Sequence, residues 1–213
     1  MKRFLSLPYL FLPVVILLAL GLRLYNLYYN SPFLDEAIYV MLGEKFLAGT
    51  WQEDSPFSWV GGMPLFYPFF SAVAYNIGGI VGSRLLNVLL GVTSTYLIFL
   101  FVKNLNIFDE RKHNVINGIV ASLFFAIAPV PLWLSRLAIY DMLSYTFFML
   151  NIVLLQAGIQ KNNRSFYFLA VLALFFSFLA KFYILRFSYL RLLRRVLFFV
   201  PLDNNRMIFV FRA

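Results

Sequence analysis

FLSLPYLFLPVVILLALGL, residues 4–22, is a run of nineteen residues without a charge. Lys2 and Arg3 precede it, and at about 1.5 Å per residue a helix of this length crosses the roughly 30 Å core of a bilayer. No small-residue cleavage site follows the run, which is also longer than the core of a signal peptide. We therefore expect a retained first membrane helix that leads from the cytoplasm to the outside.

The composition of the whole chain agrees with this expectation. Of the 213 residues, 62% are hydrophobic and 13% are charged, which is about half the charged share of an ordinary soluble domain. The apolar runs are long and continuous, which favours helices over the short alternating strands of a barrel. We therefore predict an all-α, multi-pass protein of the plasma membrane, or of the endoplasmic reticulum in a eukaryote.

The composition also excludes several classes of site. The chain has no cysteine, which excludes disulfides and thiolate metal sites, and one histidine, His113, which excludes a histidine cluster. A net charge of +9 would suggest a nucleic-acid partner for a soluble protein. Here the basic residues mostly separate apolar runs, so membrane topology explains them better and no nucleic-acid partner is expected.

Four further spans are predicted after the first. They are Leu85–Val102, Val115–Ser135, Met142–Gln160 and Ser165–Leu185. The apolar stretch Leu65–Ile77 ends at Gly78-Gly79 and is short for a span, so we expect a surface-lying or re-entrant helix there.

The basic residues support five spans. If residues 65–80 do not span, seven basic residues lie on the cytoplasmic side and five outside, whereas a sixth span would reverse these numbers against the usual cytoplasmic excess. The seven are Lys2, Arg3, Lys103, Arg111, Lys112, Lys161 and Arg164, and the five are Arg23, Lys45, Arg84, Arg136 and Lys181.

The outer segment between the first two spans is long enough to have structure of its own. Ser31 and Pro32 suit the N-cap and first position of a helix. The apolar face predicted for this helix consists of Leu34, Ala37, Ile38, Met41 and Leu42. We expect it to lie in the membrane interface, followed by a loop over residues 49–62 at headgroup level and by the second interfacial helix.

The end of the chain has a different character. Four arginines, Arg186, Arg191, Arg194 and Arg195, stand where a further span would begin, and inserting them would cost about 2.5–3.5 kcal/mol each. We therefore divide the chain into a membrane module, residues 1–185, and an atypical basic tail, residues 186–213. Two interpretations of the tail stay open, an interfacial segment and out-of-frame sequence.

The predicted topology places six charged residues on the outer side of the membrane. They are Asp35, Glu36, Arg84, Arg136, Asp141 and Lys181. A carboxylate at this level could act as a general base, and the cations suit the phosphate of a lipid-linked substrate.

Each of these residues also has a purely structural interpretation. Asp35 and Glu36 could stabilise a helix start through the helix dipole, worth about 0.3–1 kcal/mol. Asp141 could be a hydrated helix end paired with Arg136, while Arg84 and Lys181 could extend to the headgroups.

The order of several short motifs resembles that of a known family. The acidic pair Asp35-Glu36 is followed by Pro64-Leu-x-Tyr, by Arg84-Leu-Leu-Asn, by Ser135-Arg-Leu-x-x-x-Asp and by Ala180-Lys-Phe. Over residues 1–185 this order is similar to that of the polyprenyl-phosphate-sugar-dependent glycosyltransferases of GT-C fold, in particular the protein O-mannosyltransferase and aminoarabinose transferase group.

The resemblance implies an inverting sugar transfer inside a cavity open to the bilayer. It assigns Asp35 as the catalytic base, Glu36 as an acid on the acceptor side and Asp141 as the second acidic position. It matches Arg84 with the arginine that opens the following helix, Lys181 with the basic residue near the donor phosphate and Arg136 with a phosphate-binding or structural position. We expect Arg84, Lys181 or Arg136 to hold the charge of the leaving phosphate. The implied substrates are a polyprenyl-phosphate sugar and a protein or lipid acceptor. No metal ligand set is predicted, although a divalent metal is not excluded.

Two departures from the family accompany the resemblance. Gly62-Met63-Pro64-Leu65 stands where members usually have His-Pro-Pro-Leu, and members are about twice as long. The chain therefore corresponds to the amino-terminal catalytic part, for which a partner could supply further helices. The rival hypotheses are a non-catalytic membrane subunit, a transporter-like protein and an inactive remnant of the enzyme.

Overall fold

The computed structural model describes residues 7–28, 31–50, 66–107 and 110–181, and this part of the chain is helical without strands. The helices are α1 (Leu7–Leu24), α2 (Leu34–Leu47), α3 (Phe66–Asn104), α4 (Arg111–Ile127), α5 (Pro129–Leu134), α6 (Asp141–Lys161) and α7 (Arg164–Ala180). The all-α prediction is confirmed for these residues. Residues 51–62 of the loop predicted at 49–62, the motif residues Pro64 and Leu65, and the tail at 186–213 lie outside them.

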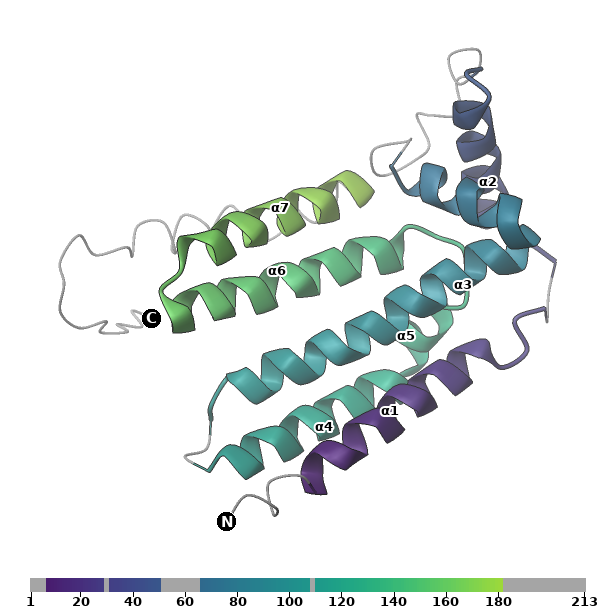
Figure 1. Ribbon diagram of the computed structural model, residues 1–213. Helices are drawn as coiled ribbons and strands as arrows, with labels where there is room; N and C mark the ends of the chain where they lie inside the picture. Colours follow the sequence, from purple (N-terminus) through teal and green to yellow (C-terminus); the bar gives the residue numbers. More distant parts are fainter. Residues whose placement is uncertain (1–6, 29–30, 51–65, 108–109, 182–213) are drawn as a thin grey trace, which may run out of the picture.

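Helices α1, α3, α4, α6 and α7 lie side by side, and successive members of this set along the chain run in opposite directions (Figure 1). Helix α6 packs between α7 and α3, while α4 packs against both α3 and α1. The short helices α2 and α5, the first residue of α6 and the last residues of α7 gather at one end of this bundle (Figure 1). That end, which we call the α2 end, contains the six charged residues that the sequence predicts on the outer side of the membrane.

Helix α3 is two helical segments joined by a sharp bend. Gly78 and Gly79 leave helical geometry, and Gly79 takes a φ of 61°, which a residue with a side chain rarely adopts. Ser83 Oγ donates to the carbonyl of Ser71 at 2.7 Å, although twelve residues of straight helix would separate these groups by about 18 Å. The first segment therefore turns away from the long axis of the bundle, as the sequence predicts for residues 65–77.

Two other predicted helices end earlier than expected. The single span predicted over Val115–Ser135 is wrong, because the chain is extended at Ala128 between α4 and α5. Pro129 and Pro131 cannot donate backbone hydrogen bonds, so they stop α4 and restart the chain in a new direction. The span predicted to continue through Lys181 ends at Ala180, and Lys181 itself is extended.

The interior of the bundle contains polar contacts between helices beside its apolar core, and its exterior is rich in apolar side chains. Ser94 bonds to Thr146 at 2.9 Å between α3 and α6, and Asn151 donates to the Ala170 carbonyl at 2.7 Å between α6 and α7. Large apolar side chains face outward, among them Leu10, Phe11, Val14, Leu17, Leu89, Phe124, Phe168, Val171 and Phe175. Small polar residues between helices and apolar residues outside suit a lipid environment.

By length and composition, α3 and α6 are able to cross a membrane, while residues 9–24 of α1 and all of α7 are apolar but shorter. This finding supports a membrane location on those two properties alone.

Helix α2 differs from its predicted form at both its start and its packing face. It starts at Leu34, after Phe33 as N-cap, and not at Pro32. Of the predicted apolar face, Leu42 is fully buried, whereas Leu34 is 71% and Met41 39% exposed. The face that packs against α3 instead contains Glu36, Tyr39, Val40, Leu42 and Gly43.

Gly43 permits the closest approach between α2 and α3. A Cβ atom added there would lie 2.0 Å from the Pro68 carbonyl oxygen. We predict that Gly43→Ala lowers the free energy of unfolding by about 1–3 kcal/mol, because one of the two backbones must shift. Gly21→Ala is the matched helical control, since nothing lies within 4 Å of its added Cβ. Unfolding by denaturing detergent in mixed micelles measures both variants, and equal stability of the two would contradict the prediction.

Candidate functional site

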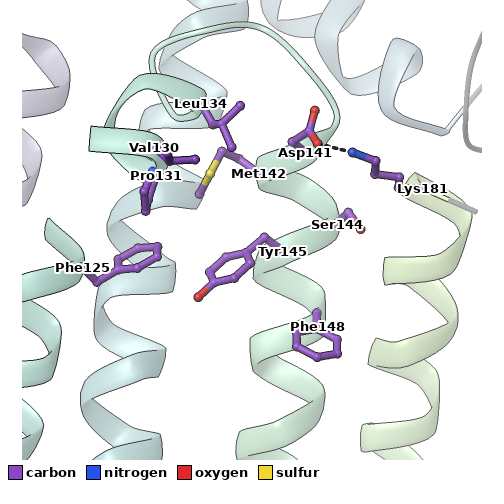
Figure 2. Close-up of a pocket in the computed structure, with 10 residues that line it drawn as sticks. All are labelled: Phe125, Val130, Pro131, Leu134, Asp141, Met142, Ser144, Tyr145, Phe148 and Lys181. Atoms are coloured by element: carbon purple, nitrogen blue, oxygen red, sulfur yellow. Dashed lines mark hydrogen bonds and ion pairs between the residues drawn. The ribbon is translucent and has the colours of Figure 1, made fainter. Parts of the chain in front are cut away.

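A cavity of about 470 Å³ opens between α4, α5 and α6 near the α2 end (Figure 2). Its lining residues are Phe125, Val130, Pro131, Leu134, Asp141, Met142, Ser144, Tyr145, Phe148 and Lys181. The lining is apolar and aromatic except at one edge, where Asp141 and Lys181 face each other (Figure 2). A volume of this size is typical of small-molecule sites.

Asp141 and Lys181 form an ion pair between two helix ends. Asp141 is the first residue of α6 and Lys181 directly follows α7, and the two side chains are 28% and 29% exposed. Ser144 and Ser177 bring these ends together, because each hydroxyl donates to the carbonyl of the other residue, at 3.1 and 2.8 Å. Lys181 Nζ also lies 5.1 Å from the centre of the Tyr140 ring.

Arg136 does not pair with Asp141, the pairing considered from the sequence. Its Nη2 donates instead to the carbonyls of Tyr25 at 2.6 Å and Asn26 at 3.3 Å, in the turn after α1. Arg136 is thereby placed between that turn and the segment before α6. It does not line the cavity.

Glu36 and Arg84 form a second, fully buried ion pair. Arg84 Nε donates to Glu36 Oε1 at 2.9 Å and Nη2 donates to Oε2 at 2.8 Å, a two-pronged contact between guanidinium and carboxylate. Arg84 Nη1 donates to the Leu27 carbonyl at 2.6 Å. The backbone N–H groups of Phe33 and Ala138 complete the shell of Glu36, at 2.8 and 2.7 Å.

This shell sets the ionisation of Glu36. Burial alone would raise the pKa of the carboxyl, but the hydrogen bonds from Arg84, Ala138 and Phe33 and the charge of Arg84 outweigh burial. The pKa of Glu36 therefore lies below the ordinary value of 4.5. Glu36 and Arg84 satisfy each other and do not line the cavity.

The segment that leads into α6 is fastened by the same network. Ala138 donates to Glu36, while Asn87 Nδ2 donates to the carbonyls of Leu137 and, at 2.6 Å, of Ile139. Both anchors come from helices far away in the sequence, α2 and α3. They fix the backbone two to four residues before Asp141, and so they position this carboxylate at the edge of the cavity.

Three tyrosines connect this network with the ion pair at the cavity. The Tyr39 ring lies 5.6 Å from that of Tyr67 and 5.1 Å from that of Tyr140. Burial raises the pKa of Tyr39, and Tyr140 and the negative charges of Asp35 and Asp141 raise it further. Asp35 and Asp141 thus act on the same phenol, although Asp35 itself is exposed.

The predicted residues therefore separate into groups. Asp141 and Lys181 share the cavity, Glu36 and Arg84 share a buried contact, Arg136 binds backbone carbonyls and Asp35 is exposed. Sequence reasoning missed Phe125 and Tyr145, since aromatic residues make up 20% of the chain and nothing singles these two out. Within the described ranges, no three acidic, histidine or cysteine side chains gather in a group that could bind a metal ion.

Comparison of the chain with protein-family models, with curated proteins and with solved structures finds no match. The resemblance to the GT-C glycosyltransferases therefore depends on the motifs of the sequence alone.

The buried pair yields a prediction about stability. We predict that Glu36→Gln lowers the free energy of unfolding by about 3–5 kcal/mol, because it leaves the buried Arg84 without its counter-charge. The matched control is the neighbouring Asp35→Asn, which changes an exposed carboxylate and should shift stability by about 0.5 kcal/mol or less. Detergent unfolding measures both. Similar losses in the two variants would show that the Glu36 contact contributes little.

The lowered pKa of Glu36 yields a prediction about pH. A carboxyl whose pKa is lower in the folded state stabilises the fold above its unfolded pKa, near 4.5, and this contribution is lost as the pH falls through the folded pKa. The unfolding midpoint of the wild type should therefore fall between about pH 5 and pH 2 more steeply than that of Glu36→Gln. Parallel curves for the two proteins would contradict this assignment.

Proposed function

We propose that the chain is a multi-pass membrane protein with five spans, formed by α1, α4, α6, α7 and the part of α3 after its bend. Four observations support this topology: the alternating directions of the five helices, their apolar exterior, their polar contacts with one another, and the length of α3 and α6. In this arrangement the α2 end faces outward, and α2 lies in the interface with its exposed apolar residues toward lipid.

We further propose that the cavity binds a lipid-linked sugar phosphate and that the protein transfers the sugar to an acceptor. The observation that carries this proposal is the Asp141–Lys181 pair at the edge of an otherwise apolar cavity. Such a cavity suits an amphiphile, because the chain of the lipid can occupy the apolar part and its charged head the polar edge. The sugar-transfer chemistry itself is proposed from the motif resemblance.

The residues can perform the transfer through an exchange of partners. A donor phosphate that binds Lys181 would replace Asp141 as the counter-charge of the ammonium group. Asp141 could then accept the proton of the acceptor hydroxyl, whose oxygen attacks the anomeric carbon while the bond from that carbon to the phosphate oxygen breaks. The polyprenyl phosphate leaves with the electron pair of that bond, and Lys181 balances its charge.

The sequence resemblance and the cavity favour different general bases. The resemblance assigns Asp35, whereas Asp141 is the carboxylate that lines the cavity. We propose Asp141 as the base and Asp35 as an acid on the acceptor side, within electrostatic reach of the same tyrosine, Tyr39.

A non-catalytic lipid-binding subunit is the second candidate. The observation that favours it is the mutual neutralisation of Asp141 and Lys181, which needs no substrate to be satisfied. The two candidates differ in one measurable property, since a subunit would bind the lipid phosphate without transferring its sugar.

The test is sugar transfer by the full chain in liposomes, from a panel of radiolabelled polyprenyl-phosphate sugars to peptide and lipid acceptors. We predict that Asp141→Asn and Lys181→Gln each lower the rate by about 100-fold or more, because they remove the base and the phosphate partner. If Asp35→Asn lowers the rate more than Asp141→Asn does, the base is Asp35.

Matched controls change like charges at the opposite end of the bundle, Glu110→Gln before α4 and Lys161→Gln at the end of α6, and should leave the rate unchanged. If the wild-type protein binds the donors without transferring any sugar, the protein is a non-catalytic lipid-binding subunit. Full activity of both cavity variants would remove the Asp141–Lys181 pair from the mechanism.

A further inference from the structure

Arg23, near the end of α1, is a fully buried cation that plays no part in the proposed transfer. Its side chain turns back along α1, and Nη1 donates to the carbonyls of Ala19 at 3.1 Å and Ala126 at 3.2 Å. The Ala126 carbonyl belongs to the last turn of α4, where the prolines of α5 leave helix carbonyls without backbone donors. Arg23 Nη1 therefore binds a helix carbonyl at the break between α4 and α5.

The other two nitrogens of Arg23 form an unused donor edge. Among the described residues, Nε and Nη2 are buried without a hydrogen-bond partner. These are the same two atoms with which Arg84 grips the two oxygens of Glu36, while its Nη1 likewise donates to a backbone carbonyl. The two arginines thus bind their backbone partners alike, and they differ in that only Arg84 has a carboxylate on its two-nitrogen edge.

The lack of a carboxylate partner among the described residues leaves the positive charge of Arg23 largely without compensation. In the part of the chain that the structure describes, no carboxylate forms an ion pair with Arg23, and the nearest counterpart is the Phe125 ring, with its centre 5.9 Å from the guanidinium carbon. A buried charge without a counter-charge is strongly unfavourable, whereas a ring face compensates only a small part of it. An anion with two oxygens on one side would satisfy both the charge and the donor edge.

The surroundings place the guanidinium behind one wall of the cavity. Gly91 of α3 makes room for the guanidinium, since a Cβ atom there would lie 2.7 Å from Arg23 Nε. Phe125, which contacts Arg23, also lines the cavity, where it stacks on Tyr145 with ring centres 5.4 Å apart (Figure 2). The Phe125 ring is therefore a wall shared by the guanidinium and the apolar cavity.

We propose that the Nε–Nη2 edge of Arg23 is a binding site for a phosphate oxyanion, carried by an amphiphile whose chain occupies the apolar cavity. The site is separate from the Asp141–Lys181 pair, because Lys181 already has a counter-charge and Arg23 does not. Access requires the Phe125 ring to rotate, a movement of one side chain. The proposal concerns binding and does not depend on sugar transfer.

The test measures equilibrium binding of radiolabelled farnesyl phosphate to the full chain in maltoside micelles, in a buffer free of phosphate. Arg23→Gln should weaken binding by about tenfold or more, because a two-pronged contact to a charged group is lost. Arg23→Lys, which keeps the charge but not the fork, should weaken it less. Lys161→Gln, which removes a cation at the opposite end of the bundle, should change it by about twofold or less.

Two competitors distinguish the source of the oxyanion. Farnesol, which has the chain without the phosphate, should compete poorly. If inorganic phosphate competes as well as farnesyl phosphate does, the oxyanion site stands and its ligand is free phosphate. Unchanged binding in Arg23→Gln would overturn the proposal, as would a loss of binding in Lys181→Gln alone.

Unfolding without ligand gives a second measurement if a variant binds too weakly to assay. Arg23→Gln removes a buried charge that has no counter-charge, so this variant should melt at or above the wild-type temperature. Arg84→Gln leaves the buried Glu36 without its counter-charge, so this variant should melt well below the wild-type temperature. Equal losses in the two arginine variants would show that the chain itself neutralises Arg23, and would also overturn the proposal.

Discussion

The buried contact between Glu36 and Arg84 is the interaction on which the α2 end depends. Arg84 of α3 donates to the turn after α1, while Glu36 accepts from Arg84, from the start of α2 and from the segment before α6. Burying either charge alone would be strongly unfavourable, so the pair favours an arrangement in which the two meet. The pair thereby joins four segments at one point, where a purely apolar contact would leave their mutual orientation less defined.

The polar edge of the cavity is positioned by this contact. Asp141 stands where it does because Ala138 is bonded to Glu36, and because Asn87 binds the carbonyls on either side of that residue. Lys181 reaches it because Ser144 and Ser177 bind α6 to α7 one turn deeper in the bundle. A carboxylate and an ammonium group from opposite ends of two helices thus meet beside apolar walls, through contacts that are themselves outside the cavity.

The long helices could be predicted from the sequence because an apolar run is a local property of the chain. The end of α4 was also visible in Pro129 and Pro131, although the apolar run continues past them. The packing face of α2 could not be found by the same rule. That face combines Glu36 and Gly43 with apolar residues such as Leu42, and because an apolar residue of a membrane protein can face either lipid or the interior, apolar periodicity alone could not identify it.

The acidic pair Asp35-Glu36 shows why spacing alone could not define the site. Adjacent residues of a helix point about 100° apart, so two neighbouring carboxylates leave the helix in different directions. Glu36 turns inward to Arg84 while Asp35 turns outward, and the partners that decide these roles come from α3 and α6. The two charged residues that meet at the cavity, Asp141 and Lys181, are 40 residues apart in the chain. Any chemistry at this end of the bundle must therefore be assembled from residues that the fold brings together.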